Sequence, residues 1–444
     1  MSCKLSDKYR TLAVHIWGLD RDFAVLDKIH LFVPFRVDAI ATSTGKRGNE
    51  LLVVDLESLG VPLRATSVLA DGKGGYQVED VSHAWESLST GFSPLAFKVF
   101  HQSLGKRVQP GVEMKASPAK LLQGHNVFGP TSIRKGGEVM LKWLAGSYPK
   151  LHALLDWQNA EVYCIDCTYS VRLPDSRTAL QLLQALRGVS NGQTRNRGDD
   201  YQTTAYWGSK ESRLRRLKAY LKGPEFRLQL DEAIKAARSY SGASFVPSHA
   251  FAAHRLLAVL QNPALIEWAE NLLRLEATVM HRWLERRNVP TNLWELCDYQ
   301  EQREEQGECF IEWCWEHVTK ELFAAFEGIS MRVINDEKVL AALKARWTKF
   351  GKNGKANETV PLNLFRTYRS LKDYGWDETM ASMSRATFYR HVDQICECGL
   401  SKAALQKLKM DDQKNNVVPI LRFLKVDFSA QRPEWYVEPT VEAA

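Results

Sequence analysis

The sequence predicts an α+β protein with a central antiparallel-type sheet, helices on one face of that sheet, and a mainly helical C-terminal domain. In the first two-thirds of the chain, strand-like runs alternate with helix-like runs. Several strand-like runs alternate polar with apolar residues, which is the pattern of a sheet with one covered face. The region from Met331 to Ala444 instead carries helical signals and a basic loop.

Periodicity and flanking residues predict each element of the sheet domain. The predicted strands are Leu95–Phe100, Val112–Lys115, Glu161–Val171, Thr203–Trp207 and Leu272–His281. The predicted helices are Glu138–Leu155 and Ser176–Leu186, with mainly helical signals from Glu225 to Glu270. Between them, Ser190–Asp200 is a polar, Gly-rich loop. We expect this domain to end near residue 290.

The segment Tyr206–Lys222, YWGSKESRLRRLKAYLK, contains a candidate nucleophile, Tyr220. We predict a helix from Ser209 that places arginines on the face of Tyr220 and leaves a separate apolar stripe for packing. The face residues are Arg213, Arg216 and Leu217, and the stripe is Leu214, Leu217 and Leu221. A phenol among groups that bind phosphate favours attack on a DNA phosphodiester, and the cations would favour the phenolate. The alternative is a packed tyrosine beside a solvated basic face.

Three predicted strands each carry a carboxylate at the middle of their polar face: Glu113, Asp166 and Glu276. Carboxylates on neighbouring strands repel one another unless a cation lies between them. Hard oxygen ligands favour Mg²⁺ or Mn²⁺, so the pattern indicates a divalent metal site. The alternative is a solvated sheet face on which Arg274–Glu276 and Lys115–Glu113 are surface ion pairs.

The C-terminal region contains a candidate helix-turn-helix. A Gly/Lys/Asn loop at Lys349–Glu358 precedes a predicted helix, Leu362–Leu371. A turn at Met383–Ser384 then leads into a helix over Arg385–Cys396, with Ser384 as its N-cap and Gly399 as its stop. Residues of types that contact DNA are Arg385, Thr387, Tyr389 and Arg390, while Phe388, Val392 and Ile395 would face the core. The alternative is an ordinary helical hairpin.

The composition fits a DNA-binding protein of the cell interior. The net charge is +7, and two basic regions, Arg195–Lys222 and Met331–Ala444, fit two DNA contacts, although solubility alone explains either. The chain has no run of about 18 apolar residues, so we expect no membrane span. Acidic residues interrupt the N-terminus, so we expect no secretory signal. We expect all eight cysteines to be reduced, with Cys164 and Cys167 on opposite faces of a strand.

Several segments together resemble the gene II protein family, the replication initiators of filamentous phages. They are Val112–Gly129, Ile165–Ser170, Leu186–Thr194, Lys218–Lys222, Ala325–Met331 and Asn415–Tyr436. The resemblance runs from about Lys28 to the C-terminus. It implies an N-terminal extension at 1–27, a rolling-circle nuclease domain at 28–290, a helical connector at 291–330 and a C-terminal region at 331–444. In this family an internal start, here Met331, gives a shorter gene X product.

The resemblance implies a site-specific endonuclease that nicks the plus strand of the double-stranded circular phage genome at its origin. The family's enzyme becomes linked through tyrosine to the 5′ phosphate, starts rolling-circle replication, and later rejoins the displaced strand. Its nucleophile falls on Tyr220, with Lys222 as a phosphate or leaving-group contact. A more distant likeness to plasmid rolling-circle initiators makes Asp166 and Glu276 the preferred ligands of Mg²⁺ or Mn²⁺. Glu113 and His125 are secondary candidates, and Cys164 stands where those relatives usually carry arginine.

The expected partners are double-stranded origin DNA, the displaced single strand, and the helicase and polymerase of the host. Self-association at the origin is also expected, in the cytoplasm of the host bacterium and without a membrane. The candidate DNA contacts are Arg195, Arg197, Arg213, Arg216, Lys218 and Arg274 in the first domain, and Arg385, Tyr389 and Arg390 in the second. The alternative function is a non-catalytic, sequence-specific DNA-binding regulator of replication. A tyrosine recombinase is disfavoured, because its Arg…His-x-x-Arg…Tyr constellation is absent from the sequence.

Overall fold

The computed structural model describes most of the chain. Its described residues are 24–44, 50–70, 76–103, 109–194, 196–197, 201–239, 247–330, 336–350, 356–398, 400, 402, 405–406, 408 and 431–441. Arg195, Met331 and Gly399, which the sequence singles out, lie outside these residues.

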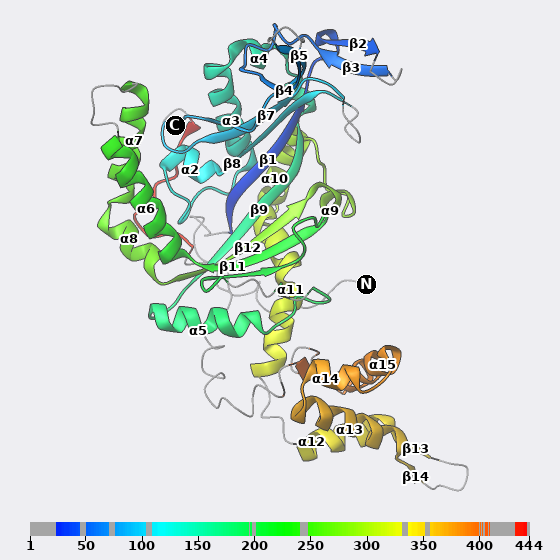
Figure 1. Ribbon diagram of the computed structural model, residues 1–444. Helices are drawn as coiled ribbons and strands as arrows, with labels where there is room; N and C mark the ends of the chain where they lie inside the picture. The colour runs from blue at the N-terminus through cyan, green and yellow to red at the C-terminus, as the bar shows by residue number, and fades with distance from the viewer. Residues whose placement is uncertain are drawn as a thin grey trace.

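An eight-stranded sheet forms the centre of the first domain (Figure 1). Its order is β10-β11-β12-β9-β1-β8-β7-β6, and every neighbouring pair is antiparallel. The strands are β1 (Val25–Pro34), β6 (Glu86–Leu88), β7 (Leu95–Phe100), β8 (Gly111–Ala116), β9 (Glu161–Arg172), β10 (Thr204–Trp207), β11 (Arg215–Leu221) and β12 (Leu272–Met280). The predicted sheet and the five predicted strands are confirmed, whereas β1, β6 and β11 were not predicted. Two separate hairpins, β2 (Ile40–Thr44) with β3 (Glu50–Val54) and β4 (Arg64–Ala70) with β5 (Tyr76–Ser82), lie outside the sheet.

One face of the sheet is apolar and covered by helices. Leu275 of β12, Leu182 of α5 (Ser176–Arg187) and Trp315 of α11 (Phe310–Ser330) belong to one core cluster. The cluster also includes buried residues of α3 (Ile133–Ser147), α4 (Pro149–Leu154), α9 (His281–Glu285) and α10 (Leu293–Glu305). Cys167 lies in this core, and Cys164 lies on the opposite face, as the alternation of a strand requires.

A second, smaller apolar cluster packs helices against the end of the sheet where β12 begins. It joins Leu272 to Val127 and Phe128 in the loop after α2 (Pro118–Gln123). The same cluster contains residues of α6 (Lys222–Ser239), α7 (Pro247–Leu260) and α8 (Pro263–Glu270). This packing brings the loop at residues 124–130 over the polar face of the sheet, next to β12.

The predicted helix around Tyr220 is wrong, because the residues from Arg215 to Leu221 form strand β11. Their alternation is that of a strand: Leu217, Ala219 and Leu221 are in the core, while Arg216, Lys218 and Tyr220 face the other way. The residue types favour a helix locally, but pairing with β10 on one side and β12 on the other satisfies both edges of the backbone. The helix begins only at Lys222, as α6.

The C-terminal helices lie together as one group (Figure 1) and have a core of their own. It contains buried residues of α12 (Asp336–Trp347), α13 (Thr359–Asp373), α14 (Trp376–Ala381) and α15 (Arg385–Cys396). A short hairpin, β13 (Lys349–Phe350) with β14 (Ala356–Asn357), connects α12 to α13. Trp376 meets Phe388 edge to face at 4.9 Å between ring centroids. The predicted N-cap is confirmed, since the Ser384 hydroxyl accepts a hydrogen bond from the Thr387 amide at 3.2 Å.

The last described residues, 431–441, return to the sheet domain. The side-chain amide of Gln431 donates to the carbonyl of Ser170 at 2.9 Å and accepts from the Ser170 amide at 2.8 Å. Arg432 donates to the carbonyl of Gly129, and Lys135 forms an ion pair with Glu438 at 2.6 Å. The label of the C-terminus in Figure 1 accordingly lies beside α2 and α3.

Two expectations about the whole chain can be compared with the described residues. None of their helices is long and apolar enough to cross a membrane. Each cysteine that the structure describes is a free thiol.

Candidate active site

The candidate site lies on the polar face of the four strands β11, β12, β9 and β1. Their registers place charged residues side by side: Tyr220 pairs with Arg274, and Lys218 pairs with Glu276. Across β9, Asp166 pairs with Thr278 on one side and with Lys28 on the other. Side chains that are direct or diagonal neighbours on one face come within about 8 Å of each other. The sheet therefore gathers a phenol, two carboxylates and three cations.

Asp166 and Glu276 are diagonal neighbours on this face. Burial, and then the negative charge of Asp166, raise the pKa of Glu276 to about 7. Asp166 is buried and forms an ion pair with Lys28, yet its second carboxylate oxygen has no hydrogen-bond partner. The two carboxylates thus repel each other in the protein without a metal.

The carboxylate pair fits a hard divalent cation. Among the described residues there is no group of three or more His, Cys, Asp or Glu side chains that could hold a metal. Mg²⁺, however, commonly binds through one or two carboxylates and completes its shell with water and substrate phosphates. Such an ion would give the unpartnered oxygen of Asp166 a partner. It would also stabilise the charged form of Glu276, whose pKa is raised in its absence. Asp166 and Glu276 would therefore hold Mg²⁺ or Mn²⁺.

Tyr220 is buried beside this pair, with only 5% of its surface exposed. Burial raises the pKa of its phenol well above the usual value, while the charge of Arg274 opposes that rise. The ammonium group of Lys218 lies over the ring, 4.0 Å from its centroid. The expectation that nearby cations favour the phenolate is not met, because burial, together with the charges of neighbouring carboxylates, outweighs the charge of Arg274.

Arg274 connects the strands of the site to the loop above them. Its guanidinium is fully buried and donates to the Ser170 hydroxyl at 3.1 Å and to the carbonyls of Asn126 and Val127. It also forms an ion pair with Asp27 at 3.8 Å. Burial alone would raise the pKa of Asp27, but the charges of Arg274 and Lys222 hold it below the usual value.

Lys222, the first residue of α6, is fully buried and contacts the same loop. Its ammonium donates to the side-chain carbonyl of Asn126 at 2.7 Å and forms an ion pair with Glu225. Burial, and then the charge of Arg274, lower the pKa of Lys222 to about 7. Near neutral pH this lysine can therefore give up a proton.

The two secondary metal candidates lie apart from Asp166 and Glu276. Glu113 is on β8, two strands from β9, and faces His30 at 3.4 Å. His125 follows the C-cap of α2, and burial and the charges of Lys222 and Arg274 lower its pKa to about 3. A neutral imidazole among cations is a poor place for a further cation.

The candidate DNA contacts fall into different environments. Arg213 is exposed in the turn before β11, and Arg216 lies on the strand about 13 Å along the chain from Tyr220, four residues away. Arg197 lies over the ring of Tyr206 at 4.6 Å, and Arg274 is buried, so it holds the loop rather than facing solvent. Arg385 and Arg390 are exposed on α15, with Tyr389 half-buried between them.

Lys28, Asp27 and Asn126 are parts of the site that the sequence did not reveal. In β1, Leu26 pairs with Cys167 and Lys28 with Asp166, so Asp27 is the extra residue of a β-bulge. The bulge lets two consecutive charged side chains reach the site, Asp27 toward Arg274 and Lys28 toward Asp166. Two adjacent charged residues in the mostly apolar run VLDKIHLFVP were the available signal.

The chain matches two protein-family models, which describe the N-terminal part of the phage replication-associated protein (gene II protein) over residues 25–306 and its C-terminal part over residues 352–442. It is 38% identical to the replication-associated protein of Enterobacteria phage M13 over 426 residues, which are 95% of this chain and 100% of that protein. It is 37% identical to the protein of that name from Salmonella phage IKe over 420 residues, 94% of this chain and 96% of that protein. No solved structure matches the chain.

The raised pKa of Glu276 predicts a pH-dependent stability in metal-free buffer. The folded protein holds this proton up to about pH 7, whereas an unfolded carboxyl releases it near 4.5. Ionising Glu276 therefore destabilises the fold progressively as the pH rises through this window. Glu276→Gln lacks this effect. The Tm of the variant minus the Tm of the unchanged protein should therefore increase from pH 4.5 to pH 7 and stay constant at higher pH.

Calorimetric melting across this pH range in EDTA measures the difference. The exposed Glu232 on α6 supplies a matched control, and Glu232→Gln should show no comparable trend. A Tm difference for Glu276→Gln that does not change with pH contradicts the raised pKa.

Proposed function

Because the chain belongs to the family of phage replication-associated proteins, the gene II proteins, we propose a function in replication. We propose that the protein initiates rolling-circle replication of a circular phage genome. In this proposal it nicks the plus strand of the double-stranded origin, stays attached to the 5′ end, and later rejoins the displaced strand. The observation that supports this most is the shared sheet face, on which Tyr220 lies beside Arg274 and the pair Asp166–Glu276. That face combines a nucleophile, a buried cation and ligands for a divalent metal.

The proposed reaction exchanges one phosphoester for another. The hydroxyl oxygen of Tyr220 bonds to the scissile phosphorus, its proton passes to solvent, and the bond from phosphorus to the 3′ oxygen breaks. Lys222, with a pKa of about 7, gives a proton to the leaving 3′ oxygen and regains one from solvent. Rejoining is the reverse attack by a 3′ hydroxyl on the phosphotyrosine. No bond energy is lost, so closing needs no nucleotide cofactor.

In this proposal the phosphate would be held chiefly by a divalent ion, because the cations of the site are each paired with a carboxylate. The charge of Arg274 opposes the effect of burial on the pKa of Tyr220. Asp166 and Glu276 would hold Mg²⁺ or Mn²⁺, which when bound polarises a phosphoryl oxygen. Lys28 and Lys218 keep the two carboxylates in place through ion pairs.

Sequence-specific binding without cleavage is the second candidate function, and one observation favours it. In α14 and α15 two helices joined by a short turn leave Arg385 and Arg390 exposed on one element. In the initiator proposal this unit contacts the origin duplex, and the protein works in the host cytoplasm with the host's helicase and polymerase and with further copies of itself. The regulator proposal keeps the binding and omits the chemistry.

Tyr220→Phe separates the two functions. The change removes one hydroxyl from a buried ring, so binding to origin DNA should stay within a few-fold while nicking is abolished. Supercoiled origin plasmid incubated with Mg²⁺ reports nicked circles, and protein attached to a 5′ end identifies the phosphotyrosine. Tyr206→Phe, on the neighbouring strand β10, is the matched control and should still nick.

Two outcomes decide against parts of this proposal. Nicking by Tyr220→Phe would show that another group is the nucleophile. Origin binding without any strand breakage by the unchanged protein would support the regulator.

Metal binding by Asp166 and Glu276 predicts a direct effect of their substitution. Asp166→Asn should weaken Mn²⁺ binding roughly tenfold or more, since removing even a supporting partner of a ligand has effects of that size. Electron paramagnetic resonance of free Mn²⁺ measures binding without DNA or activity. Glu113→Gln is the matched control, a buried carboxylate on the same sheet, and should leave the affinity unchanged. Equal losses in both variants would place the ion elsewhere.

The C-terminal region is proposed to exist also as a separate product that starts at Met331. Helix α11 ends at Ser330, and the helices that follow have their own core, so such a product would keep that core intact. An antibody against the C-terminus should detect a second band of about 13 kDa in infected cells. This is the mass expected for the part of the 50.5 kDa chain that begins at Met331. Met331→Leu should remove this band and leave the full-length band. A blot that shows only the full-length protein contradicts the internal start.

A further inference from the structure

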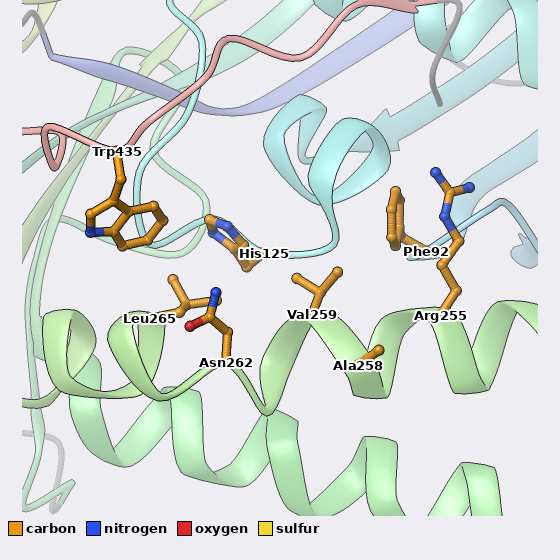
Figure 2. A pocket seen from close by; sticks show the side chains of 8 residues that line it. All are labelled: Phe92, His125, Arg255, Ala258, Val259, Asn262, Leu265 and Trp435. Atoms are coloured by element: carbon orange, nitrogen blue, oxygen red, sulfur yellow. The ribbon is translucent and has the colours of Figure 1, made fainter.

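A cavity of about 420 Å³ opens at the loop that contains His125. Figure 2 shows its walls: His125 and Trp435 lie on one side, and Val259 of α7 and Leu265 of α8 lie opposite, with Phe92 toward the far end. Ala258, Arg255 and Asn262 complete the lining. Such a volume is within the range of small-molecule sites, and its walls are mainly apolar and aromatic.

The aromatic walls are held in place by their neighbours. Phe128 meets His125 at 4.7 Å and Trp435 at 5.2 Å between ring centroids, in both cases edge to face. Gly124 has a positive φ of 84°, and a Cβ there would lie 3.1 Å from the ring of Phe92. The positive φ and the close approach of Phe92 both favour glycine at this position. The cavity is preformed by this packing.

One cation lines the cavity, and further cations lie close to His125. The guanidinium of Arg255 lies over the ring of Phe92 at 3.9 Å from the centroid. Burial and the charges of Lys222, Arg274 and Lys120 lower the pKa of His125, which shows how close these cations are to its ring. His125 is consequently neutral at physiological pH and presents an uncharged aromatic surface in a cavity that the guanidinium of Arg255 also lines.

The cavity is connected to the candidate nucleophile through strand pairing, one hydrogen bond and one peptide step. Arg274, the strand partner of Tyr220, donates to the carbonyl of Asn126, the residue after His125. The cavity and the candidate site therefore share the loop that carries His125 and Asn126, and a nucleotide next to a phosphate bound at Tyr220 is the occupant that this arrangement suggests. Aromatic side chains with cations at the rim are the usual means of binding unstacked bases and their phosphates.

We propose that this cavity, lined by Phe92, His125 and Trp435, binds an unpaired nucleobase of the DNA strand next to the cleaved phosphate. The proposal rests on the proposed function and adds a subsite to it. Base pairs in a duplex cannot enter a cavity walled by rings, so the site selects single-stranded or locally opened DNA. The C-terminal segment takes part directly, since it supplies Trp435.

Photo-crosslinking tests this subsite without requiring cleavage. Full-length Tyr220→Phe protein is mixed with oligothymidylate that carries 5-iodouracil, irradiated, and digested for mass spectrometry. Crosslinks are expected on Phe92, His125 or Trp435. Trp435→Ala and Phe92→Ala, which change two distant segments, should each weaken binding of the oligonucleotide roughly fivefold or more, the effect of losing one base stack.

Two controls make the outcome decisive. Phe251→Ala removes an aromatic ring that is 70% exposed on the same helix as Arg255 but does not line the cavity, and its affinity should not change. With an abasic oligonucleotide the losses caused by Trp435→Ala and Phe92→Ala should disappear, because no base is left to stack.

Three results would each overturn the subsite. Trp435→Ala and Phe92→Ala could lose as much affinity for the abasic strand as for the normal one, or Phe251→Ala could lose as much affinity as they do. The third result is crosslinks that avoid Phe92, His125 and Trp435. These results are independent of the nicking assay. Failure of the subsite leaves the nuclease proposal standing, and failure of nicking leaves the crosslinking result interpretable as base binding.

Discussion

The buried guanidinium of Arg274 is the interaction on which the site depends. It joins β12 to β9 through Ser170, holds the loop after α2 through two backbone carbonyls, and is balanced by Asp27 of β1. A fully buried charge is tolerated only when it is paired and hydrogen-bonded on all sides. Each of these partners is therefore fixed relative to Tyr220, which is the strand neighbour of Arg274.

The C-terminal segment extends this arrangement. Gln431 forms two hydrogen bonds with the backbone of Ser170, at a part of β9 where β1 no longer pairs. The hydroxyl of that serine accepts from Arg274. A residue far along the chain thus satisfies the open edge of a central strand and stiffens a partner of the buried guanidinium. The sheet domain and the end of the chain consequently form one unit around the site, although separate family models match them.

The sequence predicts those site residues that lie in strands with regularly alternating polar and apolar residues. Asp166 and Glu276 were placed on one face because each lies in a strand whose own residues alternate, and the registers confirm that shared face. The strand around Tyr220 was missed because its arginines, lysine and leucines suit a helix locally, while its strand pairing depends on β10 and β12. For Tyr220, the family resemblance indicates the role as nucleophile, whereas the residues around it in the sequence do not. The sequence does not predict Asp27 and Lys28 as site residues, because a β-bulge brings both to the site and no sequence pattern indicates that bulge.

The charges of the site are matched in pairs, and this bears on the need for a metal. The pairs are Lys28–Asp166, Lys218–Glu276, Arg274–Asp27 and Lys222–Glu225. An incoming DNA phosphate would find each of these four cations already neutralised by a carboxylate, so the protein alone offers it little net attraction. Protonation of Glu276, with its pKa of about 7, frees at most the charge of Lys218. A divalent ion between Asp166 and Glu276 would add two positive charges at the point where these carboxylates repel each other. The balance of buried charge thus supports a metal-dependent reaction independently of the family to which the chain belongs.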